Sequence, residues 1–139
     1  MSKPTILLVE DNPEDVSFLQ RALAKAGLSW NLRIADDGQK AIEALSAPQG
    51  VGASSELLPS HVLLDLKLPR KSGLEVLAWI RAHPRWKSVP VIVLTSSEVN
   101  SDVQGAQSLG IDAYLVKPLT LKGLMETVQQ IAATWKLPA

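Results

Sequence analysis

The feature that most constrains the fold of this chain is a set of four short, widely spaced apolar runs, at residues 6–9, 61–64, 91–94 and 113–116. None of the four alternates cleanly between polar and apolar residues, which predicts strands that are covered on both faces. A weaker run at residues 31–35 does alternate, and this pattern predicts a strand at the edge of the sheet. The chain is therefore expected to build its core around five short strands.

The segments between these runs carry apolar residues at helical spacing. The first helix has clear terminal signals, with Asn12 as N-cap, Pro13 at the first helical position and Gly27 at its end. Strands that alternate with helices of this length predict an α/β fold, in which right-handed helical crossovers join a parallel sheet. Further helices are expected over residues 39–45, 74–81, 99–109 and 120–135.

Composition is that of an ordinary globular protein, with 46% hydrophobic and 20% charged residues among 139. A single domain over residues 1–139 is expected, with no output domain. The 14 basic and 14 acidic residues cancel, so charge gives no reason to expect nucleic acid or an anionic membrane as partner. Cysteine is absent, which excludes disulfides and thiolate metal sites. No apolar run approaches the ~20 residues that span a bilayer, and no signal peptide is visible, so a cytoplasmic location is expected.

Polar side chains follow four of the predicted strands at the point where each strand ends. In an open α/β sheet, ligands bind beyond the carboxyl ends of the strands, so these side chains are expected to share one crevice. The candidate residues are Glu10 and Asp11 after the first run, Asp65 after the second, Thr95 after the third and Lys117 after the fourth.

Three carboxylates in one crevice raise each other's pKa unless a cation neutralises them. Oxygen ligands without His or Cys favour a hard ion, and Mg²⁺ suits a few carboxylates together with a phosphate. One ionised carboxylate could then attack phosphorus, while the lysine and the hydroxyl hold the phosphoryl oxygens. The crevice therefore predicts phosphoryl-transfer chemistry based on positioning and charge.

At these same residues the sequence resembles the receiver domain of two-component response regulators. The resemblance runs from Thr5 to about Trp135 and implies a flavodoxin-like fold, with strand order 2-1-3-4-5 and five helices. Five motifs in the family's order carry it: VEDNP at 9–13, LDLKLP at 64–69 followed by SG at 72–73, VLTS at 93–96, AY at 113–114 and VKP at 116–118.

The resemblance implies a phosphorylation site and a metal site. Asp65 would be the phosphoacceptor, receiving a phosphoryl group from a phosphohistidine of a sensor histidine kinase. Asp11 and Asp65 would bind Mg²⁺ together with the backbone carbonyl of Lys67, and Glu10 would act directly or through water. The chain would catalyse only its own phosphorylation and dephosphorylation, so it is not expected to be an enzyme.

The resemblance also implies a conformational switch. Thr95 and Lys117 would contact the phosphoryl oxygens, and Tyr114 matches the aromatic residue whose rotamer changes when the threonine moves. The peptide bond between Lys117 and Pro118 would be cis, which costs only ~0.5–1 kcal/mol before proline. Phosphorylation would then change a surface that binds another protein, the kinase or a downstream partner.

Two features depart from the usual family pattern. Lys67 lies two residues after the predicted phosphoacceptor, where small, polar or amide side chains are commoner, and its ammonium is expected to lie in solvent. Residues 46–59 are expected to form an extended loop between the second helix and the third strand, longer than the usual connection. This insertion and the sequence NPED at 12–15 are similar to the regulators paired with phytochrome-type histidine kinases.

Self-association is a further expectation. Some stand-alone relatives dimerise through the face built by the fourth helix, fifth strand and fifth helix, and a homodimer of this kind is expected here. The alternative is a monomer, in which the apolar stripe of the last helix is wholly core.

Other functional classes fit the residues less well. A phosphatase that works through an aspartyl phosphate usually has a second acid two residues after the nucleophile, where this chain has Lys67. A flavin-binding protein of similar topology would need a phosphate loop after the first strand, where Glu10 and Asp11 would repel phosphate. An interaction module that is never phosphorylated is the third alternative, against which the intact set of acids, threonine and lysine argues.

Overall fold

The computed structural model describes residues 3–46 and 58–137, and its centre is a sheet of five parallel strands. Five helices alternate with the strands along the chain, so the predicted fold class and the 2-1-3-4-5 order are both confirmed. From one edge of the sheet to the other, the strands are β2 (Asn31–Ala35), β1 (Thr5–Val9), β3 (His61–Leu64), β4 (Val91–Thr95) and β5 (Ala113–Val116).

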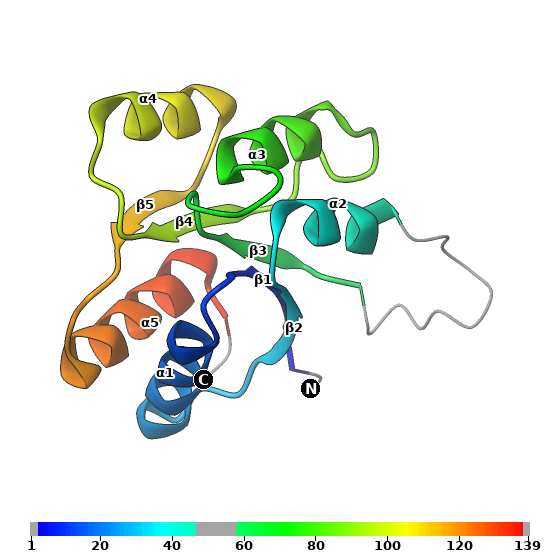
Figure 1. The fold of residues 1–139 in the computed structure, drawn as a ribbon. Coiled ribbons are helices and arrows are strands. Elements are labelled where there is room, and N and C mark those ends of the chain that lie inside the picture. Colours follow the sequence, from blue (N-terminus) through cyan, green and yellow to red (C-terminus); the bar gives the residue numbers. More distant parts are fainter. Residues whose placement is uncertain (1–2, 47–57, 138–139) are drawn as a thin grey trace.

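Helices cover both faces of this sheet (Figure 1). One face is covered by α1 (Pro13–Ala26) and α5 (Leu121–Trp135), which pack against each other. The opposite face is covered by α2 (Gly38–Ser46), α3 (Gly73–Ala82) and α4 (Asn100–Leu109). Each helix therefore buries one apolar stripe against the sheet, the usual arrangement of a doubly wound α/β domain.

The core consists of two apolar layers, because successive side chains of a strand point to opposite faces. In β1, Leu7 and Val9 face the layer under α2, α3 and α4, while Ile6 and Leu8 face the layer under α1 and α5. All five residues of β1 are buried, as are all five of β4. The unbroken apolar runs at these positions follow directly from burial on both faces.

The run at residues 113–116 is expected to be covered on both faces, and its side chains do pack against both core layers, but the coverage is incomplete. In β5, Ala113, Tyr114 and Leu115 are only partly buried, and Val116 is 42% exposed. The strand order explains the difference, since β5 lies at the edge of the sheet, as β2 does at the other edge. Apolar content alone does not distinguish a central strand from an edge strand that has neighbours on one side only.

Two further expectations concern the chain between elements. All peptide bonds of the described residues are trans, so the expected cis bond between Lys117 and Pro118 is contradicted. The two isomers differ by only ~0.5–1 kcal/mol before proline, so the local sequence does not decide between them. The predicted extended loop over 46–59 falls largely on residues 47–57, which lie outside the described part of the chain.

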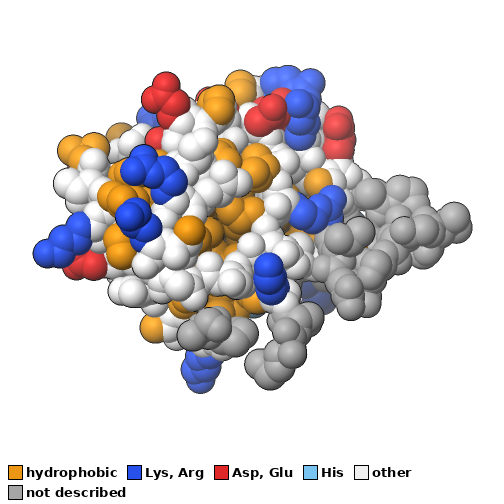
Figure 2. Space-filling view, turned by 90° about the horizontal axis from the view of Figure 1, so that it is seen from below, with side chains coloured by type: hydrophobic (Ala, Val, Ile, Leu, Met, Phe, Trp, Pro, Cys, Tyr) orange, Lys and Arg blue, Asp and Glu red, His pale blue; other side chains and the backbone are white. Residues whose placement is uncertain are grey.

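The surface mixes both signs of charge, as expected for a chain with net charge +0. Seen from below the view of Figure 1, small patches of hydrophobic atoms lie among polar atoms, with separate basic and acidic side chains (Figure 2). Among the described residues, no helix is both long enough and apolar enough to cross a bilayer.

Candidate phosphorylation and metal site

The five side chains predicted to share a crevice do meet at the carboxyl end of the sheet. Glu10 and Asp11 follow β1, Asp65 follows β3, Thr95 is the last residue of β4, and Lys117 follows β5. The ends of these parallel strands lie along one edge, so residues that are far apart in the sequence become neighbours: Thr95 and Asp65 are 30 positions apart, and Lys117 and Asp65 are 52.

Asp65 is the centre of the site and is held at both carboxylate oxygens. Its Oδ1 accepts hydrogen bonds from the hydroxyl of Thr95 at 2.6 Å and from the backbone N–H of Lys67 at 3.1 Å. Its Oδ2 accepts from Nζ of Lys117 at 2.7 Å. The residue is only 4% exposed, so it is fixed in one orientation while remaining next to the other acids.

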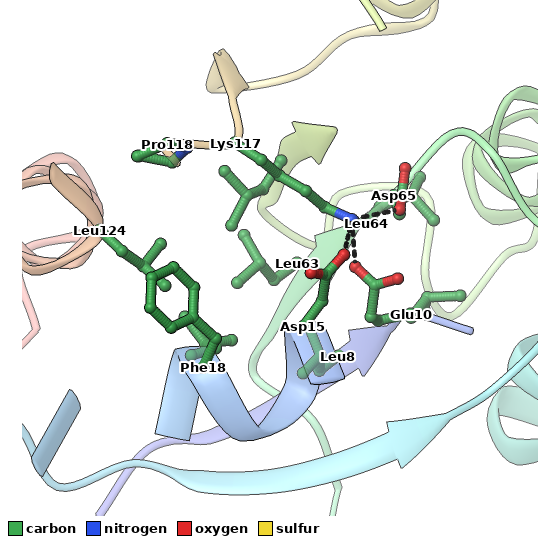
Figure 3. Close-up of a pocket in the computed structure, with 13 residues that line it drawn as sticks. Leu8, Glu10, Asp15, Phe18, Leu63, Leu64, Asp65, Lys117, Pro118 and Leu124 are labelled. Atoms are coloured by element: carbon green, nitrogen blue, oxygen red, sulfur yellow. Dashed lines mark hydrogen bonds and ion pairs between the residues drawn. The ribbon is translucent and has the colours of Figure 1, made fainter. Parts of the chain in front are cut away.

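Lys117 joins three carboxylates that come from different parts of the chain (Figure 3). Its Nζ lies 2.6 Å from Oε1 of Glu10, 2.8 Å from Oδ2 of Asp15 and 2.7 Å from Oδ2 of Asp65. Burial alone would lower the pKa of Lys117, but hydrogen bonds to Asp15, Asp65 and Glu10 outweigh it and raise this pKa. The ammonium is therefore charged throughout the physiological range.

Asp15 was missed in the sequence analysis. It lies in the first turn of α1, where acidic residues are common because they stabilise the positive end of the helix. This common role gives no indication that Asp15 also contacts Lys117, which is 102 residues away in the sequence. No local pattern signals such a pairing, which arises only when α1 packs beside the end of β5.

Glu10 is a buried acid whose charged form is disfavoured by its surroundings. Burial raises its pKa to about 7, with a smaller contribution from the negative charge of Asp65, while Lys117 and the backbone N–H of Asn12 oppose the shift. The carboxylate is 5% exposed and accepts the Asn12 N–H at 3.1 Å. Buried acids in such proximity favour a neighbouring cation, and a metal ion would add to the neutralisation that Lys117 supplies.

Glu10, Asp11 and Asp65 have the donor set for a hard divalent cation. Each offers one carboxylate oxygen, and the three oxygens lie within 4.8 Å of one another. Glu10 and Asp65 are buried, whereas Asp11 is exposed, so the group is reachable from solvent on one side. Three oxygens and no nitrogen or sulfur ligand suit Mg²⁺ or a similar ion that keeps several waters.

Lys67 contributes its backbone rather than its side chain to this arrangement. Its N–H donates to Asp65, while its side chain is exposed, in agreement with the expected position of its ammonium in solvent. The role of its carbonyl oxygen as a metal ligand stays a prediction.

The loop after Asp65 is held in place by contacts on both sides. Gly73 begins α3 directly against the backbone of Asp65 and Leu66, where a Cβ atom would lie 2.5 Å from Cα of Leu66. Arg70 adopts a left-handed conformation with φ 68° and reaches Asp37, with Nε 3.0 Å from its Oδ2. These contacts fix the backbone that carries the acceptor carboxylate.

Thr95 connects the acceptor to the first turn of α4. The backbone N–H of Ser97 donates to the Thr95 hydroxyl at 3.3 Å, and the Ser97 hydroxyl donates to Oδ2 of Asp102 at 2.6 Å. The hydroxyl of Tyr114 donates to the backbone carbonyl of Ser97 at 2.8 Å. Ser97 and Asp102 were not singled out by sequence, because a serine and an acid near a helix start are common capping residues.

Comparison with known proteins supports the same family. The family model described as response regulator receiver domain matches residues 6–129. Response regulator Rcp1 of Synechocystis sp. is 41% identical over 130 residues, which cover 94% of this chain and 87% of Rcp1. The probable methanogenesis regulatory protein FilR2 of Methanothrix harundinacea is 39% identical over 130 residues, which cover 94% of this chain and 82% of FilR2.

Solved structures agree with the sequence matches. The phosphorylated cyanobacterial phytochrome response regulator RcpA superposes with a TM-score of 0.85 at 34% identity, covering 99% of this chain and 100% of RcpA. The Mn²⁺-bound form of Rcp1 superposes with a TM-score of 0.79 at 39% identity, covering 98% and 99% of the two chains. Fold, site geometry and sequence thus converge, and the chain belongs to the response regulator receiver domain family.

Proposed function

We propose that Asp65 accepts a phosphoryl group from a histidine kinase and that its phosphorylation switches a protein-binding surface. The observation that carries this proposal is the environment of the Asp65 carboxylate. Thr95 and Lys117 hold its two oxygens, while Glu10 and Asp11 stand beside it with the donor set of a divalent cation. A receiver domain of this family has the chemistry to act as a response regulator rather than as an enzyme that turns over small substrates.

The transfer forms one bond and breaks another. A carboxylate oxygen of Asp65 attacks the phosphorus of a phosphohistidine whose other ring nitrogen carries a proton. An O–P bond forms, the P–N bond breaks, and neutral imidazole leaves with the electron pair of that bond. Burial and hydrogen bonds fix the direction of the Asp65 carboxylate. Much of the entropy of orienting the nucleophile is therefore already lost before the kinase binds. Lys117 would neutralise charge on the transferred group, and the Thr95 hydroxyl would donate a hydrogen bond to it; their present contacts with the Asp65 carboxylate support these roles.

Glu10, Asp11 and Asp65 would hold Mg²⁺, with the Lys67 carbonyl as a further ligand. When bound, Mg²⁺ would neutralise negative charge where phosphate and carboxylates meet. The oxygen-only donor set supports this choice, and Mn²⁺ in the related Rcp1 structure supports a divalent ion in this family.

The switch would run from Asp65 through Thr95 to Tyr114 and the start of α4. Thr95 now donates to the Asp65 carboxylate, and a phosphoryl group on that carboxylate would offer it new acceptor oxygens. Movement of Thr95 would disturb its contact with the Ser97 N–H, and through Ser97 the contacts to Tyr114 and Asp102. Phosphorylation thereby becomes a local charge change that biases a nearby surface.

The proposed partners are a phytochrome-type histidine kinase, a downstream protein and a second copy of this chain. The likeness to the phytochrome response regulator RcpA and to Rcp1 supports the kinase class.

Three exposed apolar side chains on or beside the face of α4, β5 and α5 support a homodimer through that face: Val99 at 53%, Val116 at 42% and Leu119 at 98% exposure. Light scattering on Leu119→Glu tests the dimer, which the added charge should weaken.

The central experiment is phosphorylation by acetyl phosphate, or by a histidine kinase, in the presence of Mg²⁺. The wild type should gain one acid-stable, hydroxylamine-labile phosphoryl group, and Asp65→Asn should gain none. Glu126→Gln is the control, because Glu126 is an exposed acid of α5 and is not one of the residues of the site. Absence of the adduct in the wild type, or its persistence in Asp65→Asn, would contradict the proposal. Steady hydrolysis of small phosphate esters would favour the phosphatase alternative.

A further inference from the structure

The ammonium of Lys117 and an incoming cation compete for the same oxygens. Nζ of Lys117 pairs with Glu10 at 2.6 Å and with Asp65 at 2.7 Å. Both acids also belong to the group of three that would hold a divalent ion. A cation can therefore bind these carboxylates only if the ion pairs of Lys117 with Glu10 and Asp65 weaken.

Asp15 offers the ammonium a partner that is not part of the metal group. Its Oδ2 lies 2.8 Å from Nζ of Lys117, while the metal group consists of Glu10, Asp11 and Asp65. Figure 3 shows Asp15 projecting from α1 toward Lys117, beside Glu10. The side chain is 39% exposed and is not one of the metal-binding acids, so it can keep its contact with Lys117 while Glu10 and Asp65 turn to the metal.

We propose that Asp15 is a positioning residue, which retains the ammonium of Lys117 at the site while a divalent cation engages Glu10 and Asp65. This inference rests on the proposed function and deepens it. Lys117 pairs with Asp15, Glu10 and Asp65, so loss of Asp15 leaves it with the two metal-binding carboxylates of this group. The ammonium then competes with the ion more strongly for these two. With Asp15, the lysine stays close to Asp65 and ready for the phosphoryl oxygens.

A purely local role for Asp15 makes a different prediction. An acid in the first turn of a helix stabilises the helix through its dipole, and Glu14 shares that position in α1. A helix effect would change stability similarly for Asp15 and Glu14, and it would not depend on Lys117. The two explanations separate when metal affinity is measured with and without the lysine.

The test is calorimetric titration with Mg²⁺ alone, repeated with Mn²⁺ alone, on five forms of the full chain. They are the wild type, Asp15→Asn, Glu14→Gln, Lys117→Met and the double variant Asp15→Asn/Lys117→Met. We expect Asp15→Asn to weaken metal binding about two- to fivefold, the size typical of a partly exposed ion pair. Glu14→Gln should change the affinity by much less, and Lys117→Met should raise it.

The decisive comparison is the effect of Asp15→Asn in the Lys117→Met background, where the proposed contact no longer exists. A clearly smaller effect there supports the proposal, because the two residues then act through each other. An equal effect in both backgrounds would overturn it, since Asp15 would then act only through its charge. Should Lys117→Met not fold, the comparison with Glu14→Gln decides, and equal effects of the two α1 variants would overturn the proposal.

Failure of the inference is distinguishable from failure of the proposed function. If the wild type binds the ion and is phosphorylated while Asp15→Asn matches it in affinity, only the role of Asp15 is refuted. If the wild type binds neither Mg²⁺ nor Mn²⁺, the metal site and the role of Asp15 are refuted together.

Discussion

Replacement of Lys117 by Met should destabilise the folded protein strongly, although the side chains are similar in length. The change leaves Glu10 and Asp65, at 5% and 4% exposure, facing each other without the ammonium that now joins them. Removal of one partner from a buried ion pair typically costs ~3–5 kcal/mol of unfolding free energy. Asp65 keeps two hydrogen bonds and Glu10 keeps one, so we expect the lower end, about 3 kcal/mol.

Urea unfolding followed by tryptophan fluorescence measures this loss, and a thermal melt should show a fall of roughly 10 °C for a domain of this size. Lys122→Met is the matched control, because Lys122 is an exposed lysine of α5, and it should change stability by at most ~0.5 kcal/mol. Saturating Mg²⁺ should stabilise Lys117→Met more than the wild type, since the ion then replaces the missing positive charge.

The dependence on pH follows from the sign of the pKa shift. Glu10 already has a pKa raised to about 7 with Lys117 present, and loss of the ammonium raises the folded-state pKa of Glu10 further. A carboxyl group whose pKa is raised on folding destabilises the folded state above its unfolded-state pKa, and the penalty is complete above the folded-state pKa. The stability deficit of Lys117→Met should therefore shrink as the pH falls toward about 7, the pKa of Glu10 in the wild type, because below it Glu10 is protonated in both folded proteins. An unchanged stability, a deficit that grows on acidification, or equal stabilisation of both proteins by Mg²⁺ would refute this reasoning.

Two further predictions concern packing and histidine. Gly73→Ala should lower stability by about 1–3 kcal/mol or more and slow phosphorylation, because its Cβ would overlap the backbone carbonyl of Asp65. Gly105→Ala is the control in chemical unfolding, since its Cβ would meet only a leucine side chain at 3.3 Å, and helix propensity favours alanine. Burial lowers the pKa of His61 against the opposing charge of Asp112, so folding stability should decrease as pH falls below the unfolded-state value. Melting temperatures across this range should decrease less in His61→Gln, and parallel curves for the two proteins would count against the assignment.

Local sequence signals predicted the elements well, because they report backbone preference and burial directly. Asn12 caps α1 through the N–H of Glu14, and Gly27 ends it with φ 74°, as expected for these residue types. The helix expected over 99–109 begins one residue later, with Val99 as its N-cap. These features need no knowledge of distant residues.

The meeting of the site residues was predictable for a different reason. Glu10, Asp11, Asp65, Thr95 and Lys117 each follow or end a strand, and the ends of parallel strands share one edge of the sheet. A position at the end of a strand is a property of the sequence, so the residues of the site could be named. Their hydrogen-bond partners could not be named, because these depend on side-chain directions.

Sequence by itself therefore determined the α/β fold, the places where its helices begin and end, and the residues gathered at the carboxyl edge. Only the tertiary structure decided that Lys117 also binds Asp15, that Ser97 lies between Thr95 and Tyr114, and that β5 is only partly buried. The physical reason is the distance along the chain over which each signal acts. Periodicity and capping act within a few residues, whereas these contacts arise when elements far apart in the chain pack together.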